Sequence, residues 1–169
     1  MQTIDLLDFV LTGSLPPFGR TTMRDDIVRL LGPHDTPHYP DHAPYGNLCF
    51  DLNYPDGPLN SVTIEFPHSD HEVQIYDWPI PRWIEKWPDP RIDWSFGPFQ
   101  PGVSTEEVQS LVTELSEIKP FDYLGKAWGH GHVLEIPQSS VTLHFTATKD
   151  SDPRTLMTIQ GGFPRHNAG

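Results

Sequence analysis

The sequence predicts an α+β protein of two tandem units, each a short helix region followed by an antiparallel sheet. Two helix signals share one pattern of apolar residues, and each precedes a pair of alternating segments joined by an acidic turn. These features place the first unit, with a Trp/Pro-rich connector, at 1–91 and the second at 92–169, and the two units can share one core. The competing interpretation is a single α+β domain whose halves are alike by chance.

Three segments have apolar residues at helical spacing, and a glycine or proline follows each of them. Residues 6–11 predict a short helix near the N-terminus, and residues 25–31 and 104–118 predict the helices of the two units. The last of these begins with a capping box, in which the side chains of Ser104 and Glu107 each accept from the other's backbone N–H. The helix at 25–31 has no such residue at the corresponding position, so we expect Thr21 or Thr22 to cap it.

Alternation of apolar and polar residues predicts half-buried strands, and Asp-Gly and Asp-Pro predict the turns between them. The expected strands lie at 48–52 and 62–67 in the first unit and at 141–145 and 156–159 in the second, with an extra strand in 129–136. Cys49 falls inside the first of these strands and is expected to be a buried core residue. The run of prolines and histidines at 33–44 is expected to be a loop.

Composition excludes several classes of function. The chain of 169 residues has 11 Lys+Arg against 23 Asp+Glu, a net charge of −12, and a sequence pI near 4.9. Nucleic acids and anionic membranes require clustered basic residues, so neither is an expected partner. An acidic surface instead favours a basic protein partner, because opposite fields steer encounter.

Localisation is predicted from three features of the chain. A lone cysteine permits no disulfide within the chain and suits a reducing compartment. The first eleven residues lack the basic start of a signal peptide, and no segment is long and apolar enough to cross a bilayer. We therefore expect a cytoplasmic protein, with an oligomeric state that the sequence leaves open.

The segment between the two units is the predicted partner-binding surface. Tryptophans and prolines alternate there, and tryptophan is enriched at the energetic centres of protein interfaces. The residues expected to contact a partner are Trp78, Trp83, Trp87, Asp70, Glu72, Asp77, Glu85 and Asp89. The alternative is that these indoles wedge the two units together inside the protein.

No motif in the sequence specifies an enzymatic reaction, and no cofactor is expected. The alternative to a binding protein is a small enzyme or a metal- or ligand-binding protein that uses His130 and His132, with His144 as a third ligand. A His-x-His pair in a strand projects both imidazoles to one face, where they can ligate a metal ion. His34, His38 and His42 lie in the proline-rich loop, which does not hold them together.

Two runs resemble a known group of proteins: residues 24–35 (RDDIVRLLGPHD) and residues 45–50 (YGNLCF). With the tandem helix-plus-sheet units, they resemble bacterial immunity-type and accessory proteins, whose units are similar to the β-lactamase-inhibitor protein fold and to an outer-membrane assembly lipoprotein fold. This chain lacks the disulfides that the secreted β-lactamase inhibitors have. The resemblance implies a compact α+β protein that binds another protein, often to block an enzyme.

The sequence thus predicts a non-catalytic, acidic protein-binding module. Its expected role is that of an immunity or antitoxin-like protein that occludes a basic toxin or enzyme.

Overall fold

The computed structural model describes residues 1–35, 39–66, 88–115, 132–146 and 154–164. Within these ranges the chain forms three helices and eight strands, a mixed α+β fold as the sequence predicts. In chain order the elements are β1 (Gln2–Asp5), α1 (Leu6–Thr12), α2 (Arg24–Leu31), β2 (His42–Tyr45), β3 (Leu48–Leu52), β4 (Leu59–Glu65), β5 (Ile92–Ser95), α3 (Thr105–Leu115), β6 (His132–Ile136), β7 (Val141–Thr146) and β8 (Thr155–Gly161).

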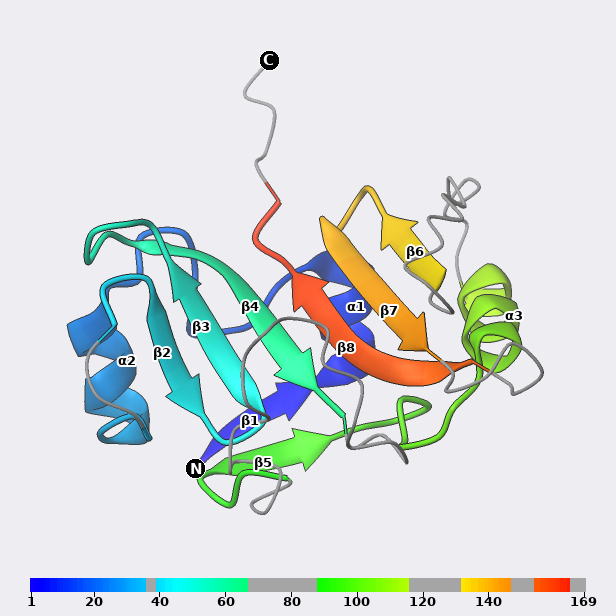
Figure 1. The fold of residues 1–169 in the computed structure, drawn as a ribbon, viewed down its shortest axis with the longest axis horizontal. Helices are drawn as coiled ribbons and strands as arrows, with labels where there is room; N and C mark the ends of the chain where they lie inside the picture. Colours follow the sequence, from blue (N-terminus) through cyan, green and yellow to red (C-terminus); the bar gives the residue numbers. More distant parts are fainter. Residues whose placement is uncertain (36–38, 67–87, 116–131, 147–153, 165–169) are drawn as a thin grey trace.

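Six of the strands form one continuous sheet in the order β2-β3-β4-β8-β7-β6 (Figure 1). All neighbours in this sheet are antiparallel, so each half is a three-stranded meander. The halves meet where β4 pairs with β8, and a helix precedes each meander in the chain. The strand order is compatible with both a pair of tandem units and a single α+β domain, so the tandem arrangement and its boundary at residue 91 stay predictions.

A second, two-stranded sheet joins the N-terminus to the start of the second half. Strands β1 and β5 run parallel, with Gln2 opposite Ile92 and Asp5 opposite Ser95. The sequence predicts neither strand, although it predicts the helix that follows β1. Asp5 caps that helix by accepting from the backbone N–H of Asp8 at 3.0 Å.

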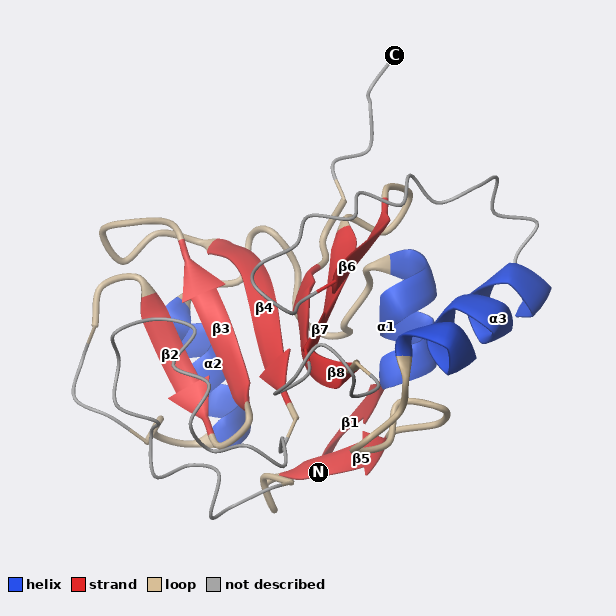
Figure 2. Ribbon diagram, turned by 45° about the vertical axis from the view of Figure 1, so that its right-hand side comes forward, coloured by secondary structure: helices blue, strands red, loops and turns tan. Residues whose placement is uncertain are grey.

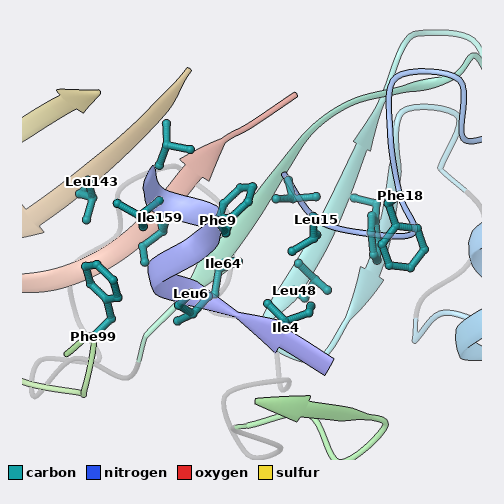
Figure 3. Packing of buried hydrophobic residues seen from close by; sticks show 14 of the residues in the cluster. Ile4, Leu6, Phe9, Leu15, Phe18, Leu48, Ile64, Phe99, Leu143 and Ile159 are labelled. Carbon is teal, nitrogen blue, oxygen red and sulfur yellow. The ribbon is translucent and has the colours of Figure 1, made fainter. Parts of the chain in front are cut away.

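Buried apolar side chains from the six-stranded sheet and from the three helices belong to one core cluster. Figure 2 shows α2 behind the first half of the sheet and α1 and α3 beside the second half. Ile27 of α2 and Val108 of α3 are both fully buried in this cluster. Phe9 of α1 lies beside Ile64 of β4 and Ile159 of β8, the two strands at which the halves meet (Figure 3).

The close approach of α1 to the end of β8 requires glycine at two positions. Gly13 ends α1 with a φ of 69°, in the left-handed region, and a Cβ there would overlap the carbonyl oxygen of Ser139. A Cβ on Gly162, which has a φ of 94°, would lie 2.6 Å from the Phe9 ring. A hydrogen bond of 2.8 Å from the Phe163 N–H to the Gly13 carbonyl then joins the two segments.

Most local predictions agree with the structure, and two are wrong. The three helices and the strands at β3, β4, β6, β7 and β8 all form where they were expected. The expected loop at 33–44 is wrong at its end, because His42–Tyr45 forms the edge strand β2. The cap of α2 is Met23 rather than Thr21 or Thr22, and Met23 makes no side-chain cap hydrogen bond. Ile118, the last apolar residue of the predicted third helix, lies outside the described residues.

In the part of the chain that the structure describes, no helix has the length and apolar composition needed to span a membrane.

Candidate functional site

The face of the sheet opposite the core carries a cluster of titratable side chains in its first half. Strand alternation places His42 of β2 and both Cys49 and Asp51 of β3 on this polar face. The register puts His42 opposite Asp51, Asp51 opposite Ser61, and Cys49 opposite Thr63. Strands β2 and β3 therefore build what we call the His42–Cys49–Asp51 cluster, and Ser61 and Thr63 of β4 lie beside it.

The three side chains of the cluster lie within reach of one another. One potential ligand atom from each residue falls within 4.8 Å of the other two. The Nδ1 atom of His42 is 3.3 Å from Oδ1 of Asp51, and its Nε2 atom is 3.6 Å from Oδ2 of Asp41. The imidazole thus lies between two carboxylates, with Cys49 beside it.

Hydroxyl groups on β4 fix the orientation of the Asp51 carboxylate. Thr63 Oγ1 donates to Asp51 Oδ2 at 2.9 Å, and Ser61 Oγ donates to the same oxygen at 3.2 Å. Both hydroxyl groups bind the same carboxylate oxygen, so Oδ1 is turned toward His42. The cluster is therefore held by neighbouring side chains as well as by the register of the strands.

Burial dominates the electrostatics of this face. It raises the pKa of Glu65, at the end of β4, to about 7, and the negative charge of Asp51 adds to the shift. Burial also raises the pKa of Asp51, although Thr63 and His42 oppose the change. The pKa of the Cys49 thiol is raised well above its usual value by burial and then by the charges of Asp51 and Glu65.

These surroundings disfavour a nucleophilic role for Cys49. A reactive thiol needs a setting that stabilises the thiolate, such as a nearby cation or a helix N-terminus. Here burial and two carboxylates keep the proton on sulfur at neutral pH. The expectation that Cys49 is a buried core residue is also wrong, because the side chain is half-buried on the polar face.

The polar face continues onto the second half of the sheet, where one of the histidines of the alternative metal site lies. His144 on β7 is opposite Val133, whereas His132 on β6 is opposite Phe145. Positions 132 and 144 therefore have opposite parity in the pleated sheet. His130 lies outside the described residues. Burial lowers the pKa of His144, and the charge of Glu135 partly opposes the shift.

Seven of the eight predicted partner-binding residues lie outside the described residues: Trp78, Trp83, Trp87, Asp70, Glu72, Asp77 and Glu85. The eighth, Asp89, is fully buried. Its Oδ1 atom accepts from Arg91 Nε at 2.9 Å, and its Oδ2 atom accepts from Arg91 Nη2 at 2.6 Å. Asp89 is thus held inside the protein by Arg91, and its expected contact with a partner stays a prediction.

Arg91 connects distant parts of the chain through this ion pair. Its Nη2 atom also lies 2.8 Å from Oδ1 of Asp35, and its guanidinium group stacks 4.9 Å from the centre of the Tyr45 ring. The Tyr45 hydroxyl donates to the carbonyl of Gly32 at 2.8 Å. The network thus fastens the loop after α2 and strand β2 to the segment that leads into β5.

The exposed charge of the described surface is predominantly negative. Exposed acids occur on the two-stranded sheet, on all three helices, in the loop after α2 and on the β3–β4 turn: Asp5, Asp8, Asp25, Asp35, Asp56, Asp93, Glu106 and Glu107. Of the lysine and arginine residues within the described ranges, only Arg29 is exposed, and it pairs with Asp26 at 3.1 Å. The other described arginines are partly buried.

Sequence reasoning missed most of the His42–Cys49–Asp51 cluster. The alternation at 48–52 and 62–67 puts four residues at the polar positions of two predicted strands: Cys49, Asp51, Thr63 and Glu65. The missing signal was β2, since without that strand His42 has no fixed position relative to Asp51.

Comparison of the chain with protein families, with curated proteins and with solved structures found no significant match.

Proposed function

We propose that this chain is a cytoplasmic, non-catalytic protein that binds a basic protein and occludes it, as an immunity or antitoxin-like protein does. The sign of the exposed charge carries the proposal. On the described surface the exposed acids greatly outnumber the exposed lysine and arginine side chains, of which Arg29 is the one present. The net charge of −12 extends the same imbalance to the whole chain.

The electrostatic field of such an acidic surface has a specific consequence for binding. It accelerates the encounter with a basic partner and repels acidic ones, and salt screens both effects because the charges are exposed. The anchor of the complex would be the aromatic connector, with Trp78, Trp83 and Trp87 as its candidates. Acids would thus set the rate of association, and buried indoles the lifetime of the complex.

The test starts with affinity capture from the lysate of the native host at low and high salt. The captured protein is then purified, and its association rate and affinity are measured against salt concentration. We expect a basic partner whose association slows as salt rises, and a Trp83→Ala variant that dissociates faster while keeping the melting temperature of the parent.

Three outcomes would count against the proposal. Capture could yield no reproducible basic partner, or the association rate could be insensitive to salt. A large loss of thermal stability in the Trp83→Ala variant would instead place Trp83 in the core, which is the wedge alternative.

A further inference from the structure

We propose that the His42–Cys49–Asp51 cluster binds a divalent cation of the Zn²⁺ class. The cluster offers an imidazole nitrogen, a sulfur and a carboxylate oxygen, all within 4.8 Å of one another. These are the ligand types that proteins use for zinc, whereas Mg²⁺ and Ca²⁺ prefer sites made of oxygen alone. The inference is independent of the proposed partner.

The geometry needs only a small contraction to close around a metal ion. With zinc–ligand bonds of ~2.0–2.3 Å, tetrahedral ligands lie roughly 3.3–3.5 Å apart. The separation of His42 Nδ1 and Asp51 Oδ1, 3.3 Å, is already in that range. Cys49 lies two residues before Asp51 on the same face of β3, and its sulfur is within 4.8 Å of a ligand atom of each of the other two residues.

Neighbouring side chains orient both the carboxylate of Asp51 and the imidazole of His42. Thr63 and Ser61 donate to Asp51 Oδ2, so Oδ1 remains directed toward His42 for the cation. The other imidazole nitrogen, Nε2, faces the carboxylate of Asp41 at 3.6 Å. A ligating histidine commonly directs its second nitrogen to a carboxylate, which fixes the tautomer and makes the ring a better ligand.

Charge and access also favour a cation. The carboxyl groups of Asp51 and Glu65 both act electrostatically on Cys49, and their negative charges make the electrostatic potential at its sulfur favourable to a cation. When the metal binds, the thiol proton is released to solvent and a sulfur–metal bond replaces the S–H bond. The His42 side chain is 48% exposed, which opens a path to the half-buried sulfur and carboxylate.

Within the part of the chain that the structure describes, the cluster supplies three ligands, which leaves one position of a tetrahedral zinc site for a further donor. Zinc sites with three protein ligands hold a water molecule there, or a group from a bound molecule.

The decisive experiment is titration of the metal-free, full-length chain with Co²⁺ and with Zn²⁺. Because Cys49 is the only cysteine in the chain, a sulfur-to-cobalt charge-transfer band in the near ultraviolet assigns the thiolate to this site without any mutation. We expect that band to saturate at one Co²⁺ per chain, with visible bands of tetrahedral intensity, and to disappear when Zn²⁺ is added.

Variants locate the other ligands. His42→Gln and Cys49→Ser should each weaken Zn²⁺ binding by at least about 100-fold, and Thr63→Val, which loosens Asp51, by about 10-fold. His144→Gln is the matched control, because this histidine lies on the same polar face but outside the cluster, and its affinity should equal that of the parent. Circular dichroism of each metal-free variant checks that it is folded.

Either of two results overturns the site. One is the absence of a charge-transfer band in the parent chain, whether or not Co²⁺ binds elsewhere. The other is Zn²⁺ affinity that is unchanged in a folded His42→Gln variant. Should Cys49→Ser fail to fold, the spectrum of the parent still decides whether the thiolate is a ligand.

Discussion

Glu65 is the residue at which burial and charge conflict most clearly. It lies on the polar face of β4, and burial together with the charge of Asp51 raises its pKa to about 7. A carboxyl group with a raised pKa in the folded state keeps a proton that the unfolded chain has already released. Folding stability therefore falls as pH rises from the unfolded value of 4.5 through about 7, and it stays lower above that.

We predict that Glu65→Gln flattens this pH dependence. The ionised carboxylate costs the fold up to about 3 kcal/mol above pH 7, and an amide carries no charge to desolvate. The variant should gain stability relative to the parent between about pH 5 and about pH 8. Urea unfolding at several pH values measures the difference.

The control for this prediction is Glu106→Gln on α3, because that carboxylate is exposed to water. Its effect should be small and nearly constant with pH. If the stability difference between Glu65→Gln and the parent were independent of pH, the buried carboxylate would not be the source of the dependence.

At the scale of elements, α2 and α3 differ in how they begin. The Ser104 N–H of α3 donates to Glu107 Oε2 at 2.8 Å, and the Glu107 N–H donates to Ser104 Oγ at 3.3 Å. In α2 the Met23 N–H donates to Asp26 Oδ2 at 3.0 Å, but the thioether provides no oxygen for the return bond. Helix α2 therefore has one of the two hydrogen bonds of a capping box, whereas α3 has both.

We predict opposite effects from exchanging these two caps. Ser104→Ala should destabilise the protein by about 1 kcal/mol, and Met23→Ser should stabilise it by up to about 1 kcal/mol. Ser110→Ala, in the exposed middle of α3, controls for the change from serine to alanine alone. Urea midpoints of the three variants test the prediction, and a neutral Met23→Ser would show that α2 gains nothing from a serine cap.

The sequence predicts those elements whose signals are local. The capping box at Ser104 and the apolar spacing in α1, α2 and α3 involve neighbours in the chain, so they can be read without the fold. The alternation in β3, β4, β7 and β8 is local as well. Two of these strands, β3 and β4, supply most of the polar face on which the cluster lies.

The elements that were missed depend on distant partners. The partners in β1 and β5 are 90 residues apart in the chain, and nothing in either segment indicates the other. Strand β2 contains Pro44, which has no N–H to donate and therefore argues against a strand. Proline is tolerated here because β2 lies at the edge of the described sheet and has one neighbouring strand there, β3. Because His42 belongs to β2, the candidate site was missed together with the strand.

At the scale of the whole molecule, one core serves both halves of the sheet. Helix α1 precedes the first meander in the chain, yet its Phe9 lies between strands of both halves (Figure 3). Gly13 and Gly162 allow this close packing, since a Cβ at position 162 would lie 2.6 Å from the Phe9 ring. A continuous core of this kind favours unfolding as a single unit rather than one half at a time.

We predict that Phe9→Ala destabilises the protein by about 3–5 kcal/mol and leaves one unfolding transition. The fully buried ring lies beside both Ile64 and Ile159 in the shared core (Figure 3), so its truncation should loosen the packing of both halves together. Tryptophan fluorescence and far-ultraviolet circular dichroism should therefore give coincident urea curves in the parent and the variant. Leu7→Ala, on the half-buried side of α1, should cost clearly less. Two separated transitions would instead mean that each half folds alone, which would support the boundary near residue 91 as a division between domains.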